Sequence, residues 1–201
     1  MKRFMISALV ATALAFPAMA ALRPGAAAPD FKAKASHAGK TFDFSLASAL
    51  RKGPVVLYFY PAAFTGGCNA EAHAFAEDSA KFAAAHATII GVSGDSIQRL
   101  NAFSSDPKYC AGKFSVASDP EGAIGRSFNL KVTVRRADQP VSMDSRNVAI
   151  DNKIGIERTT FVITRDHRIA AVYSSSDDKI RPSDHADKSL ALVETLANHR
   201  H

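Results

Sequence analysis

The chain has 201 residues, of which 47% are hydrophobic and 22% are charged, and its formal net charge is +6. This length suits one domain with a proper hydrophobic core. The basic residues are scattered, and the densest cluster, Lys131 with Arg135-Arg136, has no interleaved aromatic side chains. This pattern is typical of a solvated basic loop and argues against a nucleic-acid-binding groove.

The first twenty residues have the pattern of a secretory signal. Lys2-Arg3 form a short cationic start, residues 5–16 an uncharged apolar core, and Ala18-Met19-Ala20 a small-residue cleavage site. Cleavage after Ala20 would leave residues 21–201, with 23 basic and 19 acidic residues. A membrane anchor is the weaker alternative, because the apolar run is shorter than a span requires and no second hydrophobic segment follows. We therefore expect a periplasmic or secreted protein that is not bound to a membrane after signal removal.

The first half of residues 21–201 begins with a hairpin and then alternates strands with helices. In chain order it carries a strand at 31–36, a turn at 38–40, a strand at 41–44, a buried strand at 55–60, a helix at 69–86, a strand at 88–93 and a helix capped by Asp95 or Ser96. Ala72, Phe75 and Phe82 lie close to one face of the helix over 69–86. The order strand, helix, strand is typical of an α/β protein.

The second half continues this alternation after one segment that the pattern does not assign. In chain order it carries a strand at 114–117, a short helix at 121–128, the unassigned segment at 131–156, strands at 160–163 and 169–173, and a closing helix at 187–199. The unassigned segment is expected to be a hairpin or a mobile loop, and long excursions of this kind are often functional. Parallel strands joined by crossovers and antiparallel strands at the hairpin predict a mixed sheet in a three-layer α/β sandwich.

Cys68 is the first of two cysteines and ends the run Tyr60-Pro61-Ala62-Ala63-Phe64-Thr65-Gly66-Gly67-Cys68. This run lies between the predicted buried strand and the predicted helix, which places the cysteine at a helix N-terminus. Helix N-termini carry unpaired N–H groups and partial positive charge, and both favour a thiolate over a thiol. The sequence therefore predicts a reactive cysteine.

Pro61, Thr65 and Cys68 have the spacing Pro-x-x-x-Thr-x-x-Cys, and other segments accompany it in order along the chain. They are Pro24-Gly25-x-x-Ala28-Pro29-Asp30-Phe31, Ser118-Asp119-Pro120, Arg158-Thr159-Thr160-Phe161-Val162-Ile163 and Pro182-x-x-His185-Ala186. The set resembles the peroxiredoxins of the alkyl hydroperoxide reductase and thiol-specific antioxidant group, and the last segment resembles the bacterioferritin comigratory protein, or peroxiredoxin Q, branch. The resemblance implies that residues 21–201 form a thioredoxin-like domain. It also implies a cofactor-free peroxidase that reduces hydrogen peroxide and organic hydroperoxides.

The chemistry of peroxide reduction gives each candidate residue a role. An anionic nucleophile must attack the O–O bond, and donors must stabilise the negative charge on the departing oxygen. Cys68 is the predicted nucleophile, and Arg158 is the guanidinium that holds thiolate and peroxide. Thr65 is predicted to accept from the peroxide and donate to the sulfur, and Pro61 to shield the thiolate from water. By resemblance, Glu71 is expected to orient Arg158.

Each of these residues also has a purely structural interpretation. Thr65 would be a helix cap, Pro61 a strand terminator, and Arg158 a surface arginine. Glu71 would be favoured in a first helical turn by the helix dipole alone.

Cys110, the only other cysteine, is the predicted resolving residue for the sulfenic acid that forms at Cys68. A disulfide requires Cα atoms within about 7 Å, so the first helical turn after Cys68 is expected to unwind locally. In this the chain departs from many members of the branch, which carry a resolving cysteine where this chain has His73 and an arginine where it has Ala76. Two alternatives remain open: a one-cysteine enzyme with an inert Cys110, and a non-catalytic module with a structural Cys68–Cys110 disulfide.

Other chemistries lack their sequence signals. The histidines show no paired metal-ligand spacing, and neither a nucleophile elbow nor a phosphate-binding glycine loop is present. A thiol–disulfide oxidoreductase is disfavoured because there is no Cys-x-x-Cys pair. The expected partners are a peroxide and a thioredoxin-like or other dithiol reductant, and a monomer is expected by resemblance.

Overall fold

The structure of the protein, a computed structural model, describes residues 21–136, 142–150 and 152–198. Its main sheet has seven strands in the order β2-β1-β5-β4-β3-β8-β9. The strands are β1 (Lys32–His37), β2 (Lys40–Ser45), β3 (Val55–Phe59), β4 (Thr88–Ser93), β5 (Ser115–Ser118), β8 (Thr159–Ile163) and β9 (Ile169–Ser174). β3, β4 and β5 run parallel, and the other neighbouring pairs are antiparallel.

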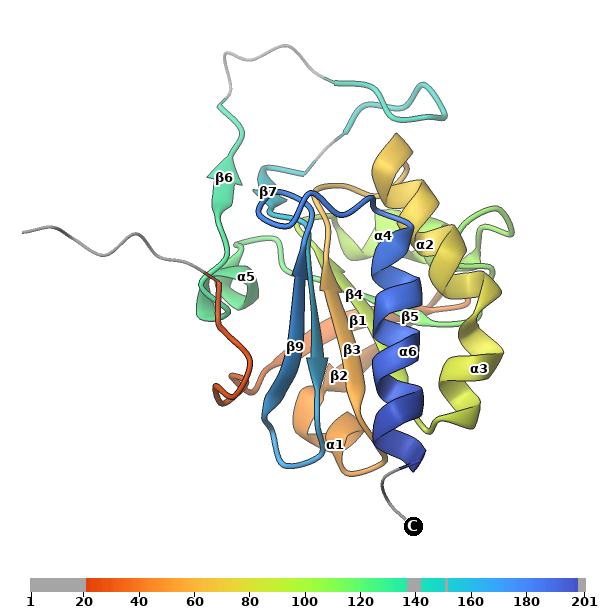
Figure 1. Cartoon of the computed structure of the whole chain (residues 1–201). Helices are drawn as coiled ribbons and strands as arrows, with labels where there is room; N and C mark the ends of the chain where they lie inside the picture. Colours follow the sequence, from red (N-terminus) through yellow and green to blue (C-terminus); the bar gives the residue numbers. More distant parts are fainter. Residues whose placement is uncertain (1–20, 137–141, 151, 199–201) are drawn as a thin grey trace, which may run out of the picture.

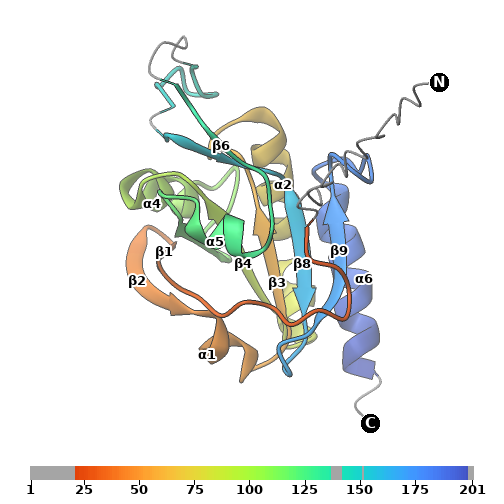
Figure 2. The ribbon, with the colours of Figure 1, turned by 90° about the vertical axis from the view of Figure 1, so that its left-hand side faces the viewer.

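The central strand β3 supplies both hydrophobic cores because its side chains alternate between the two faces of the sheet. Val56 and Tyr58 enter one core, and Val55, Leu57 and Phe59 enter the other. The first core lies under α2 (Gly66–Glu77), α3 (Ser79–Ala84), α4 (Ile97–Ser105) and α6 (Asp184–Asn198), and the second under α1 (Leu46–Leu50) and α5 (Ala123–Ser127). Figure 1 shows α2, α3 and α6 side by side, and Figure 2 shows α1 and α5 on the opposite face of the sheet.

This architecture confirms the predicted three-layer mixed sandwich with its N-terminal hairpin, and corrects two details. The helix predicted over 69–86 is two helices, because Asp78 leaves the helical region at φ −92° and ψ 5°. The short helix α1 is not anticipated by the sequence pattern. Its start is stabilised by Ser45, whose side chain accepts a hydrogen bond from the backbone N–H of Ser48.

The two ends of the segment over 131–156 pair with each other in a two-stranded ribbon. β6 (Val132–Val134) and β7 (Ile154–Ile156) pair antiparallel in a second, two-stranded sheet. The hairpin alternative is therefore correct for the two ends. Ile154 and Ile156 belong to the second core, so the ribbon is anchored to the main sheet.

The register of β3 with β8 brings two distant parts of the sequence to one edge of the sheet. Phe59, the last residue of β3, pairs with Thr159, the first residue of β8. Arg158 therefore lies beside the point at which the chain leaves β3 and turns toward α2. Among the described residues, none of the helices is long and apolar enough to cross a membrane. The predicted signal over 1–20 lies outside these residues.

Candidate active site

The loop between β3 and α2 makes a tight turn that delivers Cys68 into the interior. Phe64 adopts a left-handed backbone conformation with φ +63°, which is uncommon for a bulky residue. The surroundings hold it there, because its ring packs against Phe103 and Tyr109 with centroids 5.0 and 5.7 Å away. α2 then begins at Gly66, and Cys68 lies in its first turn with only 2% of its surface exposed. The prediction that Cys68 lies at a helix N-terminus is confirmed.

Arg158 contacts the sulfur directly. Its Nη2 donates a hydrogen bond to Cys68 Sγ over 3.1 Å, and its Nη1 donates to Oε2 of Glu71 in an ion pair. Although burial lowers the pKa of Arg158, the charges of Glu71 and Cys68 raise it above its ordinary value. Gly67 leaves room for this guanidinium, since a Cβ there would lie 3.2 Å from Nη2. The structure thus brings the predicted nucleophile, cation and orienting carboxylate together.

His185 extends this chain of contacts into the core, and the sequence analysis gives it no role in the site. The imidazole is fully buried, with Nδ1 2.8 Å from Thr160 Oγ1 and Nε2 2.9 Å from Ser175 Oγ. Its Nδ1 also lies 3.6 Å from Glu71 Oε1. Burial, together with the charge of Arg158, lowers the pKa of His185 to about 4, so the imidazole is neutral at physiological pH. The Pro182-x-x-His185 spacing is the signal that points to it.

Glu71 is a buried carboxylate with one paired oxygen. Burial raises its pKa to about 8, while the charge and hydrogen bond of Arg158 act in the opposite direction. Oε2 is held by Arg158, and Oε1 has no hydrogen-bond partner among the described residues. The predicted contact between Glu71 and Arg158 is therefore present, in a strongly desolvated setting.

Thr65 and Pro61 flank the turn in different ways. Thr65 occupies the N-cap position without a side-chain capping bond, and its hydroxyl donates to the Ala62 carbonyl over 2.8 Å. A hydroxyl has one hydrogen, so in this arrangement Thr65 can accept from a substrate but does not donate to the sulfur. Pro61 is exposed to solvent, and its carbonyl accepts from Asn152 Nδ2 over 2.9 Å. Its predicted shielding role stays a prediction.

Cys110 lies in the turn that follows α4, in the same core as Cys68 and fully buried. Neither cysteine forms a disulfide. Burial, with a contribution from Asp106, raises the pKa of the Cys110 thiol well above its ordinary value. Cys110 is therefore protonated and shielded while the protein is in this conformation.

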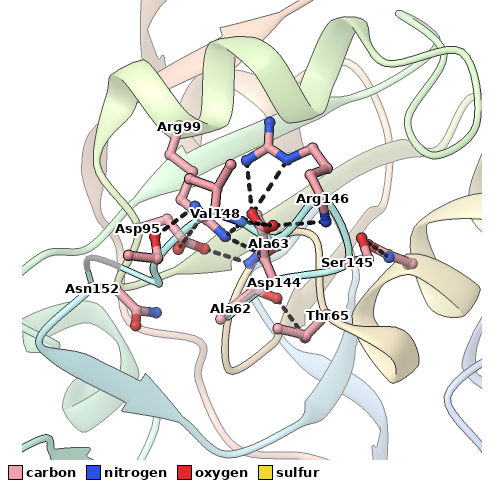
Figure 3. Close-up of polar contacts among 12 residues, drawn as sticks. Ala62, Ala63, Thr65, Asp95, Arg99, Asp144, Ser145, Arg146, Val148 and Asn152 are labelled. Carbon is pink, nitrogen blue, oxygen red and sulfur yellow. Dashed lines mark hydrogen bonds and ion pairs between the residues drawn. The ribbon is translucent and has the colours of Figure 1, made fainter. Parts of the chain in front are cut away.

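A buried ion-pair network, which the sequence analysis does not identify, holds the turn before Cys68 (Figure 3). The backbone N–H of Ala63 donates to Asp95 Oδ2 over 2.7 Å, and Arg99 Nη2 donates to the Ala63 carbonyl over 3.0 Å. Arg99 Nη2 also donates to Asp144 Oδ2 over 2.7 Å. The sequence signal nearest to this network is Asp95 after a buried strand, where the sequence predicts Asp95 or Ser96 as a helix cap. Ser96 is the residue that caps α4.

Acidic, histidine and cysteine side chains are the usual metal ligands. In the described parts of the chain, no three of them are grouped so as to hold a metal ion.

Comparison with known proteins places this geometry in a family. The AhpC/TSA family matches residues 24–172. Peroxiredoxin Bcp of Bacillus subtilis is 28% identical over 173 residues, which are 86% of this chain and 96% of that protein. The chloroplastic peroxiredoxin Q of Populus jackii is 29% identical over 177 residues, 88% of this chain and 70% of that protein.

Solved structures agree with these sequence matches. The crystal structure of peroxidoxin BcpB from Mycobacterium tuberculosis superposes with a TM-score of 0.68 at 28% identity, covering 87% of this chain and 97% of that one. The resemblance drawn from the sequence and the thioredoxin-like fold are both confirmed. The chain belongs to the AhpC/TSA family and is a peroxiredoxin-type thiol peroxidase.

Proposed function

We propose that Cys68 is the peroxidatic residue and reduces hydrogen peroxide and organic hydroperoxides. The observation that carries this proposal is the 3.1 Å hydrogen bond from Arg158 Nη2 to Cys68 Sγ, in the first turn of α2. A guanidinium and a helix N-terminus both stabilise the thiolate, which is the reactive form. Glu71 fixes the orientation of the guanidinium through Nη1 and leaves Nη2 on the sulfur.

The reaction begins with attack of the thiolate on one oxygen of the peroxide ROOH. An S–O bond forms, the O–O bond breaks, and the electron pair leaves with RO⁻, which takes up a proton to give ROH. Arg158 stabilises the charge on the departing oxygen, and Thr65 Oγ1 accepts a hydrogen bond from the incoming peroxide. Cys68 is left as a sulfenic acid.

Cys110 resolves this sulfenic acid in the proposed cycle. Its thiol attacks the sulfur of Cys68, an S–S bond forms, and water leaves, so no further oxidant is needed. Because both cysteines are buried, this step requires local opening of the turn around Cys68. A thioredoxin-like or other dithiol reductant then reduces the disulfide and restores both thiols.

We infer that the enzyme works in the periplasm or outside the cell as a monomer. The charged start, apolar core and small-residue site over residues 1–20 support export. In an oxidising compartment the dithiol reductant must be supplied from outside the usual cytosolic thiol pool.

Peroxide consumption in the presence of a dithiol reductant tests the central proposal. Wild-type protein is expected to turn over, and Cys68→Ser to lose the activity, because serine cannot form the anionic sulfur nucleophile. Equal rates for the two proteins would contradict the proposal.

Mass spectrometry after one equivalent of peroxide distinguishes the possible fates of Cys68. A Cys68–Cys110 bridge supports the two-cysteine cycle, whereas a lasting sulfenate on Cys68 indicates a one-cysteine enzyme. A bridge that is already present before peroxide and survives mild reductant would indicate a structural disulfide in a non-catalytic module.

A further inference from the structure

Residues 142–150 together with Asn152, here called the strap, contact the turn that carries Cys68. They belong to the excursion over 131–156, which has no role in the proposed reaction. In Figure 1 this part of the chain passes near the N-terminal end of α2. Three sets of contacts hold the strap there, and each involves a different side chain of the strap.

The first contact is a buried ion pair. The side chain of Asp144 is fully buried, and Oδ2 accepts from Arg99 Nη2 over 2.7 Å and from Arg146 Nη2 over 2.8 Å. The same Arg99 Nη2 donates to the carbonyl of Ala63. One guanidinium group therefore ties the strap to the turn that precedes Cys68 (Figure 3).

The second set of contacts is made by Ser145, which contacts a sequence neighbour of each cysteine. Its backbone N–H donates to the Phe64 carbonyl over 2.8 Å. Its Oγ accepts from the side-chain amide of Asn69 over 3.2 Å and lies 3.4 Å from the hydroxyl of Tyr109. Asn69 follows Cys68 and Tyr109 precedes Cys110, so the strap bridges the two segments that must approach each other in a disulfide.

The third contact lies at the other end of the strap. Asn152 is buried, and its Nδ2 donates to the Pro61 carbonyl over 2.9 Å. Between the two ends, the guanidinium of Arg146 stacks on the Phe64 ring with Cζ 3.2 Å from the centroid. The whole turn from Pro61 to Phe64 is thus held from the strap side.

We propose that Asp144 is a positioning residue for the peroxidase reaction: through Arg99 it keeps the strap closed against the turn before Cys68, and release of the strap admits Cys110. While the strap is closed, Cys68 faces Arg158 and Cys110 is buried. When it opens, both cysteine segments become free to move, and Cys110 reaches solvent, where its thiol ionises more readily. This inference rests on the proposed function.

Strap opening decides between two fates of the sulfenic acid. In one, the Cys110 thiol attacks Cys68, the disulfide forms and water leaves. In the other, a second peroxide molecule transfers one oxygen to the sulfenic sulfur, giving sulfinic acid and ROH. A strap that opens faster favours the disulfide, and a tighter strap favours overoxidation.

Thiol labelling of Cys110 measures the opening without relying on the peroxidase cycle. In a Cys68→Ser background, only Cys110 reacts with a maleimide under native conditions. Asp144→Asn is expected to raise its labelling rate by at least about tenfold, because the strap then loses its charged partner for Arg99 and keeps only the 3.4 Å hydrogen bond from Arg99 Nη1 to the Ala149 carbonyl. Asp43→Asn, which removes an exposed ion pair with Lys34, serves as the matched control and should leave the rate unchanged.

Asn152→Ala loosens the other end of the strap and keeps the test decisive if Asp144→Asn does not fold. It should also raise the labelling rate of Cys110. The increase should exceed what the loss of global stability, measured by urea unfolding, accounts for. Labelling rates within about twofold of wild type in the folded variants would overturn the proposal.

Stopped-flow oxidation with Cys68 present supplies the second readout. The Asp144 and Asn152 variants should oxidise more slowly at Cys68, form the disulfide faster, and require more peroxide for inactivation than wild type. Wild-type protein that consumes no peroxide would instead contradict the proposed function itself. If wild-type protein is active and both variants divide between disulfide and sulfinic acid as wild type does, only the proposed role of the strap is overturned.

Discussion

At the scale of single residues, the site depends on one guanidinium that contacts two acidic side chains. Arg158 uses Nη2 for Cys68 and Nη1 for Glu71, a division that requires the planar fork of arginine. A lysine keeps the charge but offers a single nitrogen, which cannot hold both partners in fixed directions.

We therefore predict that Arg158→Lys lowers the second-order rate constant for peroxide by about 100-fold, the usual effect of removing a donor to developing charge. Stopped-flow measurement of Cys68 oxidation checks this value. Arg165→Lys, at an exposed arginine that donates to the Arg51 carbonyl, is the control and should react like wild type. Similar losses in both variants would show that the effect is not specific to the site.

His185 gives the protein a predictable response to acid. Its folded-state pKa of about 4 lies below the ordinary value of 6.5, chiefly because of burial and then because of Arg158. Between these two pH values His185 binds more protons in the unfolded chain than in the folded one, so its contribution to stability falls as the pH is lowered, whereas Glu71, with its raised pKa, contributes in the opposite direction. The other charged groups that face the imidazole are Glu71, Asp178, Asp184 and Lys188.

The free energy of unfolding should therefore drop by up to about 3 kcal/mol between pH 6.5 and pH 4 through this one group. His185→Gln keeps side-chain hydrogen bonding but cannot titrate, so this part of the drop should disappear. Urea unfolding across the pH range makes the comparison, with the exposed His73→Gln as control. Parallel curves for wild type and His185→Gln would contradict the prediction.

At the scale of elements, the ribbon of β6 and β7 is seated on the main sheet by close backbone contact. A Cβ at Gly94, just after β4, would lie 2.4 Å from the carbonyl oxygen of Ile154 in β7. Since Ile154 follows Asn152 closely in sequence, the position of β7 also determines where the strap ends. The ribbon thus links the far end of the excursion to the turn at Pro61.

Gly94→Ala is expected to displace β7 and to lower the free energy of unfolding by about 1–3 kcal/mol, with a parallel loss of peroxidase rate. Gly155→Ala is the matched control on β7, because the nearest atom to its Cβ is the Thr133 hydroxyl at 2.8 Å, which can rotate away. Urea unfolding and peroxide consumption measure the two effects. Full stability and activity in Gly94→Ala would show that the ribbon position is not critical.

At the scale of the whole molecule, two cores on either side of one sheet give a rigid frame for the site. The parallel strands β3 and β4 lead to the turn before Cys68 and to Asp95, because the carboxyl ends of neighbouring parallel strands meet at one edge. Large exposed hydrophobic side chains among the described residues are few: Phe42, Val134, Met143 and Val148.

The proposed export also concerns the whole chain, and we predict that the mature protein begins at Ala21. Replacing Ala18 and Ala20 by bulky residues should block the cut, because the cleavage site requires small side chains. Intact-mass measurement of the exported protein checks the start. A chain that retains Met1 and stays in the cytosol would contradict the prediction.

Much of the fold was predictable because its signals are local. The apolar run of β3, the hairpin and the turn ending at Cys68 each follow from neighbours in sequence. The break at Asp78 and the helix α1 were missed, since short helices depend on caps and packing more than on periodicity. The segment over 131–156 has no such local signal, because its described parts are placed by partners far away in sequence, such as β7 for β6 and Arg99 for Asp144.

The sequence by itself identified the candidate nucleophile and the chemistry proposed for it, since Pro61, Thr65 and Cys68 lie in one turn whose spacing carries the family signature. It also singled out Arg158, but only through resemblance. Tertiary structure alone decided the rest: the register of β3 with β8 puts the guanidinium on the sulfur, and folding of the excursion puts Asp144 on Arg99. Burial of these charges gives the contacts their strength, and burial is a property of the packed molecule that no local pattern contains.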